Sequence, residues 1–329
     1  MTIRSTSKLR CEFEKTSPEL FFSLVDYRNK LLTSNNPEKI IEFYNGFENR
    51  DQLIQWMKKR PKGVSYIYEV EGDKDIIVVI PTANINGKYG VNCREDIFKG
   101  LHMIFVESGG IGDFYFNIAH NINVGIKKAL EYNPKWIVFS SDDMFKIDDT
   151  TVLINELKSL NNQKCTVVYT KPSSYHSIPC KLGRSLWTRR ILYKLLGKWK
   201  SNQIRLEQKF GVNYFLAPIG GYWRFFFGHG VRIISIADFG IFSANFFEDN
   251  SGFYDEIYIN SSEDMDISLR VFMANECRTN TICYRIGDYK GSTLGNGTDR
   301  RLMEIAGLAY FNHKVENEYL TSLNKQVGK

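Results

Sequence analysis

A chain of 329 residues with 43% hydrophobic and 24% charged residues has the composition of a folded globular protein, which excludes a disordered or fibrous chain. The mean hydropathy is −0.30, and no uncharged stretch reaches the roughly 18 to 20 apolar residues of a membrane-spanning helix, which argues against an integral membrane protein. The net charge of +6 favours anionic partners without identifying one.

Cysteine usage and the first residues bear on where the protein is found. The six cysteines form no Cys-x-x-Cys pair, and no histidine lies at zinc-ligand spacing from them. We interpret them as reduced, structural thiols. The beginning of the sequence lacks the apolar core of a secretory signal. Together these features predict a cytoplasmic protein.

The first part of the chain, residues 1–74, is expected to form a mainly helical extension. Helices are predicted after Ser17-Pro18, Asn36-Pro37 and Asn49, because apolar residues recur at helical spacing behind each of these capping residues. Pro61 ends the helical part, and Val64–Val70 has the composition of a strand.

From Asp75 the pattern changes to strands that alternate with helices, which predicts an α/β fold. Ile76–Ile80, Leu101–Val106 and Trp136–Phe139 are continuous apolar runs, as in parallel strands that are buried on both faces. The other elements expected here are a helix over Asn121–Tyr132, a helix capped by Asp148 or Asp149, and a strand over Cys165–Tyr169.

Polar residues follow three of these strands. Asn84, Glu107 and the pair Asp142-Asp143 each come shortly after an apolar run. In an open parallel sheet the carboxyl ends of the strands share one rim, where ligands bind. Adjacent carboxylates at that rim suit a hard divalent cation, and Mg²⁺ completes its coordination shell with phosphate oxygens and water. The alternative is that Asp142 and Asp143 only cap the following turn.

A second acidic cluster, Glu263-Asp264-Met265-Asp266, precedes apolar residues at helical spacing. The helix dipole favours carboxylates in a first turn, so one interpretation is ordinary capping. The other interpretation is catalytic, because a carboxylate kept ionised at such a place can accept a proton from a hydroxyl nucleophile.

Residues 75–312 resemble the family 2 inverting glycosyltransferases of GT-A fold. The resemblance rests on motifs that follow the family's order: Ile76–Asn84, Glu107–Asp113, Asn123–Ala129, the DxD-like Ser140–Phe145, Phe239–Ser243, Gly252–Glu256 and Glu263–Arg270. It implies a Rossmann-like mixed sheet flanked by helices. One glycosyltransferase domain would span 75–329, with a nucleotide-sugar half at 75–170 and an acceptor half at 210–312.

The resemblance also implies a reaction and its residues. A hexosyl group would move with inversion from a nucleoside diphosphate sugar, with UDP the first choice, to a hydroxyl of a glycan, protein or lipid-linked acceptor. Asp264 would be the general base, with Glu263 beside it. Mn²⁺ or Mg²⁺ would be held by Asp142, Asp143 and Asp288. The nucleotide sugar would be bound by Pro81, Thr82, Asn84, Glu107, Asp113, Asn123, Gly125, Ser140 and Asp142.

Two residues depart from the family pattern. Ser140 stands at the first acidic position of the DxD motif, so metal binding would rest on Asp142 with Asp143 beside it. Asp288 stands where many members of the family have a histidine ligand. Because aspartate is itself a good ligand for Mg²⁺ or Mn²⁺, this exchange is compatible with metal binding.

The segment Lys181–Lys209 concentrates the positive charge, with nine Lys or Arg and one Glu, a net charge of +8. Drawn as a helix, Lys181–Lys200 has basic residues on one side and leucines on the other, although Trp187 and Arg189 interrupt this separation. This basic helical insert, with the aromatic run Tyr214–Phe227 after it, predicts a peripheral protein on an anionic membrane surface, at the inner face of the membrane. The alternative is a helix that packs into the core with a solvated basic face.

Two other functions fit parts of the sequence. A nucleotidyltransferase uses a similar sheet with metal-binding acids, but the turn Pro81–Asn84 lacks the glycine and the basic residue of a phosphate-binding loop. A non-catalytic protein could bind glycan or nucleic acid through Lys181–Lys209. The two acidic clusters argue against nucleic acid.

Overall fold

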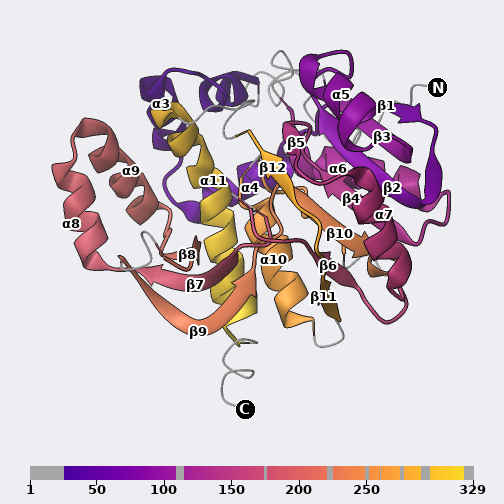
Figure 1. Cartoon of the computed structure of the whole chain (residues 1–329). Coiled ribbons are helices and arrows are strands. Elements are labelled where there is room, and N and C mark those ends of the chain that lie inside the picture. The colour runs from indigo at the N-terminus through magenta and orange to yellow at the C-terminus, as the bar shows by residue number, and fades with distance from the viewer. Residues whose placement is uncertain are drawn as a thin grey trace.

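The computed structural model describes residues 26–108, 115–173, 176–220, 225–248, 252–259, 261–274, 278–289 and 297–321, with the backbone alone for 227–231. Asp113, predicted to contact the nucleotide sugar, lies outside the described residues. The centre of the fold is a seven-stranded mixed sheet of order β1-β3-β2-β4-β10-β6-β11 (Figure 1). Its strands are β1 (Ser65–Val70), β2 (Asp73–Thr82), β3 (Leu101–Ser108), β4 (Trp136–Ser140), β6 (Val167–Tyr169), β10 (Phe239–Ser243) and β11 (Thr279–Thr281).

The middle of this sheet is parallel, as the apolar runs predict. β2 pairs in parallel with β3 on one side and with β4 on the other. β10 then runs antiparallel to β4, with Phe239 opposite Ser140. The amino end of β10 therefore lies beside the carboxyl end of β4, and a residue just before β10 reaches the rim where the parallel strands end.

Both faces of β2 are buried, which explains its continuous apolar sequence. Ile76, Val78 and Ile80 belong to one core, together with side chains of α7 (Thr150–Ser159) and of the π-helical turn η1 (Cys93–Ile97), which follows α5 (Lys88–Asn92). Ile77 and Val79 belong to the core on the other face, under α6 (Ile118–Leu130). The predicted cap of α7 is confirmed, because the Asp149 carboxylate accepts a hydrogen bond from the Thr151 N–H at 3.0 Å.

Two of the three predicted N-terminal helices begin after their predicted capping residues, whereas the predicted beginning of the first, after Ser17-Pro18, lies outside the described residues. α3 (Pro37–Asn45) is capped by Asn36 and α4 (Arg50–Lys59) by Asn49, and residues 26–32 are helical as well. These helices pack against α11 (Thr298–Lys314), which is followed by the π-helical turn η5 (Val315–Tyr319). The Tyr44 hydroxyl joins them, since it donates to the Leu302 carbonyl at 2.8 Å. The N-terminal part thus shares a core with the last helix, and its strand β1 completes an edge of the main sheet.

The prediction of one helix over Lys181–Lys200 is wrong. Pro179–Ser185 is instead β7, the middle strand of a second sheet with β8 (Tyr214–Pro218) and β9 (Phe226–Ile234), in the order β8-β7-β9. Hydrogen-bond ladders on both of its edges hold β7 extended and bury Leu182. Helical periodicity cannot detect such pairing, because the partner strands come later in the sequence.

The helical part of the basic segment begins only at Trp187. It consists of α8 (Trp187–Leu195) and α9 (Lys198–Lys209). Gly197 separates the two helices at a φ of +98°, a left-handed conformation that residues with a side chain rarely adopt. The chain therefore folds back at this point, and α8 packs against α9 instead of continuing its axis (Figure 1).

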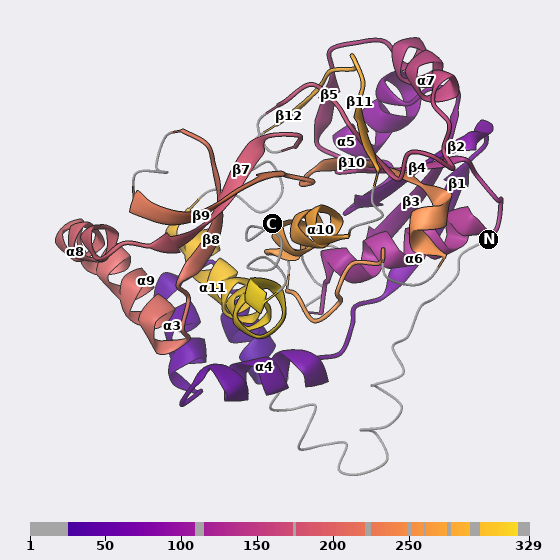
Figure 2. The ribbon, with the colours of Figure 1, turned by 90° about the horizontal axis from the view of Figure 1, so that it is seen from below.

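Helix α10 (Glu263–Met273) lies between the main sheet with α6 and the group of helices α3, α4 and α11. Figure 2 shows it with the main sheet and α6 on one side and α11 on the other. Its Ile267 and Val271 pack into the core under α6, while Leu269 packs into the core of α3, α4 and α11. A small ladder of β5 (Met144–Lys146) with β12 (Ile286–Asp288) and the 3-10 turn η4 (Ala244–Phe247) complete the elements. In the described residues, no helix combines the length and the apolar character needed to cross a bilayer.

Candidate functional site

The rim of the parallel strands brings Thr82 and Asp142 together. Thr82 ends β2 and Asp142 follows β4, and the Thr82 hydroxyl donates to the Asp142 carboxylate at 2.7 Å. The pKa of Asp142 is raised to about 6, mainly by burial and also by the charge of the neighbouring Asp143, while this hydrogen bond opposes the shift. Ser140 is fully buried and its hydroxyl donates to the Ser141 carbonyl, so it shapes the turn behind Asp142.

The loop after β2 is held by Glu107, at the end of the neighbouring strand. The Glu107 carboxylate accepts a hydrogen bond from the Ile85 N–H at 2.9 Å. Within the loop, the exposed Asn84 side chain accepts from the Asn86 N–H at 2.9 Å, a local turn that asparagine favours. Pro81 is buried at the end of β2. The three strand ends thus meet at one rim, as predicted.

Asp288 lies near Asp143 although the two residues are far apart in the sequence. In the ladder of β5 with β12, Asp288 stands opposite Met144, the residue after Asp143. The Tyr289 N–H donates to the Asp143 carbonyl at 2.9 Å. The predicted metal residues Asp142, Asp143 and Asp288 therefore belong to one region of the molecule.

Asp238 is an acid of this region that sequence reasoning missed. It directly precedes β10, and its carbonyl accepts a hydrogen bond from the Ser141 N–H at 2.8 Å. The pKa of Asp238 is raised to about 7, mainly by burial and also by the charges of Asp264, Asp143 and Asp288. In the sequence, Asp238 is visible only as an acid just before an apolar strand. Its place at the rim follows from the antiparallel direction of β10, which the sequence does not give.

The acidic first turn of α10 faces the same region. Helix α10 begins at Glu263, as predicted, after Ser262, which has a left-handed φ of +72°. Burial raises the pKa of both Glu263 and Asp264, and the Asp264 charge raises that of Glu263 further. The positive charge of Arg300, in the first turn of α11, opposes both shifts. Arg300 is thus a cation close to these acids that the sequence did not single out.

We call Asp142, Asp143, Asp238, Glu263, Asp264 and Asp288 the acidic cluster. Its members come from four separate stretches of the chain. The charges of other members help to raise the pKa of Asp142, Asp238 and Glu263, which indicates negative charge that the protein only partly compensates. One oxygen of Glu263 is buried without a hydrogen-bond partner. Hard carboxylate oxygens with excess negative charge fit a divalent cation. Among the described residues, however, no three His, Cys, Asp or Glu side chains are gathered closely enough to hold a metal ion, so the metal stays a prediction.

Comparison with known proteins gives no assignment. No family model matches the chain, and no curated protein matches its sequence. The acidic cluster is therefore interpreted from its own geometry and chemistry.

Two predicted nucleotide-sugar residues have packing roles in the structure. The buried Asn123 side chain forms hydrogen bonds with both the N–H and the carbonyl of Tyr254, at 2.9 and 2.8 Å. At Gly125, an added Cβ would lie 2.3 Å from the Val79 side chain, because α6 approaches the sheet closely there. These contacts explain both residues structurally, and their part in binding a nucleotide sugar stays a prediction.

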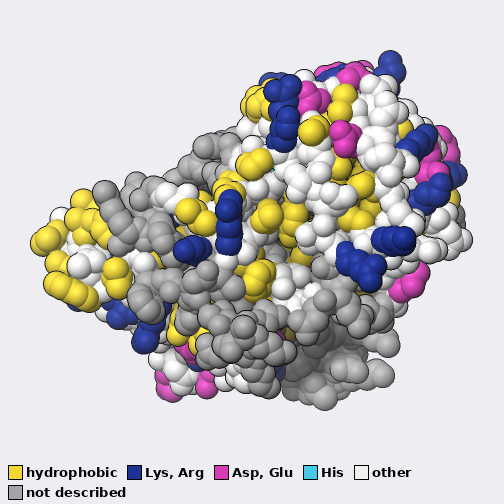
Figure 3. Space-filling model, turned by 60° about the horizontal axis from the view of Figure 1, so that its bottom comes forward, with side chains coloured by type: hydrophobic (Ala, Val, Ile, Leu, Met, Phe, Trp, Pro, Cys, Tyr) yellow, Lys and Arg dark blue, Asp and Glu magenta, His cyan; other side chains and the backbone are white. Residues whose placement is uncertain are grey.

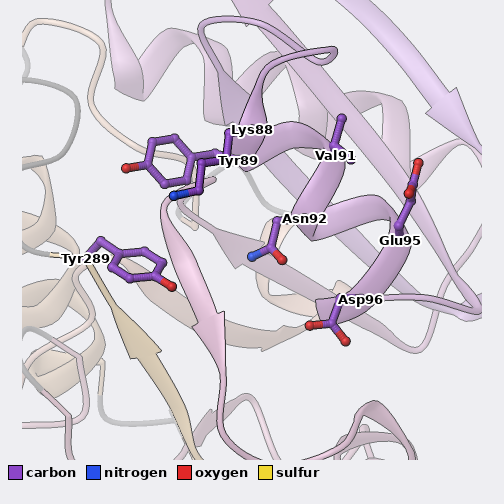
Figure 4. A pocket seen from close by; sticks show the side chains of 7 residues that line it. All are labelled: Lys88, Tyr89, Val91, Asn92, Glu95, Asp96 and Tyr289. Atoms are coloured by element: carbon purple, nitrogen blue, oxygen red, sulfur yellow. The ribbon is translucent and has the colours of Figure 1, made fainter.

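A hollow of about 310 Å³ lies beside the acidic cluster (Figure 4). Tyr89 and Tyr289 stand at one end with their ring centres 6.1 Å apart, and Asp96 stands at the other end. Its remaining lining residues are Lys88, Val91, Asn92 and Glu95. Because the Tyr289 N–H also binds the Asp143 carbonyl, the hollow opens next to the rim and extends it towards α5.

Proposed function

We propose that the protein is a GT-A-type glycosyltransferase that moves a hexosyl group, with inversion, from a nucleoside diphosphate sugar to an acceptor hydroxyl. The observation that carries the proposal is the convergence of two acidic motifs. Asp142 and Asp143 follow a parallel strand and Asp264 lies in the first turn of α10, and the charges of both Asp143 and Asp264 raise the pKa of Asp238. The mixed sheet, with β10 antiparallel among parallel strands, also supports a Rossmann-like fold of this kind.

Asp264 would act as the general base. Its carboxylate takes the proton of the acceptor hydroxyl while that oxygen forms a bond to the anomeric carbon of the donor sugar. The bond from that carbon to the diphosphate oxygen breaks on the opposite face, and the nucleoside diphosphate leaves with the electron pair. Burial raises the pKa of Asp264, which gives the carboxylate a stronger pull on a proton near neutral pH.

The other members of the acidic cluster would serve the donor. Asp142, with Asp143 beside it, would provide ligands to Mn²⁺ or Mg²⁺ together with diphosphate oxygens, and the cation would stabilise the negative charge of the diphosphate. Asp288 would become a third protein ligand only by moving closer, because the described residues gather no three such ligands in this structure. Thr82 orients the Asp142 carboxylate through its hydrogen bond. Glu107 orders the loop after β2, where the base and ribose would lie. UDP is the proposed nucleotide, and a glycan, a protein or a lipid-linked sugar is the proposed acceptor.

A thermal-shift screen of nucleoside diphosphates and nucleotide sugars, with and without Mn²⁺ or Mg²⁺, tests the donor site. A ligand that binds the folded state raises the midpoint of unfolding by mass action. We expect a metal-dependent rise with one nucleotide, and its loss in Asp142→Asn. If no nucleotide raises the midpoint under any condition, the donor assignment is wrong.

The base is tested separately with Asp264→Asn. We expect this variant to keep the nucleotide-induced shift and to lose release of nucleoside diphosphate in the presence of acceptor. Asp51→Asn is the matched control, because Asp51 is an exposed acid in the first turn of α4. An Asp264→Asn protein with undiminished transfer would exclude Asp264 as the base and leave the donor site intact.

A further inference from the structure

Helix α8 presents an apolar surface to solvent. Trp187 is 67% exposed, Leu195 78% and Leu196 57%. Trp187, Ile191 and Leu195 follow one another at intervals of four residues and so form one stripe along the helix. With the exposed Leu192 and Leu196 beside it, we call this set the apolar stripe. Exposed apolar side chains in such a group mark an interaction site more often than isolated ones do.

The orientation of α8 is fixed by its inner face. Arg189 is buried there and forms two hydrogen bonds with Glu207 of α9, at 2.6 and 3.0 Å. Its guanidinium also lies over the Phe215 ring, 4.7 Å from the ring centre. The helix is therefore anchored by a charged residue and directs its apolar residues outward. This contradicts the alternative from the sequence, a helix that packs its apolar face into the core.

Positive charge surrounds the apolar stripe. Arg184, Lys194, Lys198 and Arg205 are exposed on β7, α8 and α9, and we call them the basic rim. Lys198 also forms an exposed ion pair with Glu38 of α3, at 3.0 Å. The single acid of Lys181–Lys209 is Glu207, which is buried and engaged by Arg189. In Figure 3 the tip of the molecule at the left carries a group of hydrophobic side chains with Lys and Arg side chains beside it. Figures 1 and 2 place α8 at this tip, at the edge of the molecule.

The positive charges around the apolar stripe favour one kind of binding partner for this surface. A lipid surface with anionic headgroups complements the basic rim with its phosphates and the apolar stripe with its acyl chains. A second copy of the chain would instead bring two basic rims face to face, which like-charge repulsion disfavours. A tryptophan next to leucine and isoleucine is typical of side chains that enter the boundary between headgroups and acyl chains.

We propose that α8 docks the protein on an anionic membrane surface, with the apolar stripe inserted at the interface and the basic rim on the lipid phosphates. The insertion is shallow, because α8 is a short helix of nine residues that lies along the surface. The inference is independent of the proposed transfer reaction, since it rests on α8 and its surroundings alone. It also goes beyond that reaction, because it assigns the protein to a membrane surface.

Flotation with lipid vesicles tests the proposal. We expect the protein to float with vesicles of equal parts phosphatidylglycerol and phosphatidylcholine, to stay behind with pure phosphatidylcholine, and to be released by high salt. Leu195→Ser with Leu196→Ser should weaken binding by about tenfold or more, since both side chains lose their apolar contact with lipid. Ile147→Ser is the matched control, because Ile147 is an exposed isoleucine outside α8.

Tryptophan quenching by brominated lipid gives a second readout. Trp56 and Trp136 are buried, whereas Trp187 is exposed on the stripe and Trp199 of α9 is half-buried. In a protein with Trp199→Phe and Trp223→Phe as background, Trp187→Phe should therefore remove most of the quenching. The proposal is overturned if the protein ignores phosphatidylglycerol vesicles, or if the serine variants bind as well as the control. It is also overturned if sedimentation shows a dimer that the serine variants dissociate, because the stripe is then an interface between copies.

Discussion

Asp238 is expected to reduce the stability of the protein at alkaline pH. Its folded-state pKa is about 7, whereas an unfolded aspartate titrates near about 3.9. Between these values the folded state holds a proton that the unfolded state has released, so stability falls as the pH rises and the loss is complete above about pH 7. A shift of about 3 units corresponds to about 4 kcal/mol. Because the side chain keeps partial contact with solvent, we expect about 1 to 3 kcal/mol.

Asp238→Asn removes this penalty while keeping the shape of the side chain. Urea unfolding should show the variant about 1 to 3 kcal/mol more stable than the natural protein at about pH 8.5, and nearly equal to it at about pH 4.5. Glu248→Gln is the control, since Glu248 is an exposed carboxylate outside the acidic cluster. Its stability should not change between the two pH values relative to the natural protein.

The pH dependence of the stability difference between Asp238→Asn and the natural protein shows whether the charge of Asp238 is its cause. A gain of the same size at both pH values would mean that the amide merely packs better. A variant less stable than the natural protein at alkaline pH would mean that the charge of Asp238 is compensated in the folded state, and the description of the acidic cluster would be wrong. The expected result would also indicate that Asp238 is retained at a cost in stability, as is common at functional sites.

Two further substitutions test the packing that supports the site and α8. Gly125→Ala should destabilise the protein by about 1 to 3 kcal/mol in urea unfolding, because its methyl group would meet the Val79 and Val106 side chains at 2.3 and 2.9 Å; an unchanged midpoint would show that α6 can move off the sheet. Arg189→Met should cost about 3 to 5 kcal/mol by leaving Glu207 buried and unpaired, and adding Glu207→Leu should restore much of the loss. A double variant less stable than the single one would contradict that account.

The sequence predicts the parts of the fold that local chemistry determines. Capping residues such as Asn36, Asn49 and Asp149 begin their helices at the expected places, because a side-chain oxygen satisfies an N–H of the first turn. The continuous apolar runs predict strands buried on both faces, and parallel strands necessarily end at the same edge. This is why Asn84, Glu107 and Asp142 could be expected at one rim, whereas the hydrogen bond of Thr82 to Asp142 came only with the structure.

What the sequence could not predict depends on partners that are distant in the chain. Asp238 joins the acidic cluster only because β10 runs antiparallel to β4, and nothing in its neighbours gives that direction. Lys181 and Leu182 of β7 fit the helical pattern of basic and apolar residues that continues after them, yet strands on both sides hold β7 extended. The outward face of α8 likewise depends on Glu207, which draws Arg189 inward and so turns the leucines towards solvent.

Helix α10 has a further consequence through its double packing. Ile267 and Leu269 are successive odd-numbered positions, yet they anchor the helix in two different cores. Both cores therefore fix the position of this helix, and a shift of one core relative to the other would displace Glu263 and Asp264. Asp142 is held instead by Thr82 of the sheet and by η1, where the Cys93 thiol donates to the Asp142 carbonyl at 3.3 Å. The distance between Asp142 and Asp264 therefore depends on how the two cores pack against each other. Core substitutions far from the rim would affect the chemistry by changing that distance.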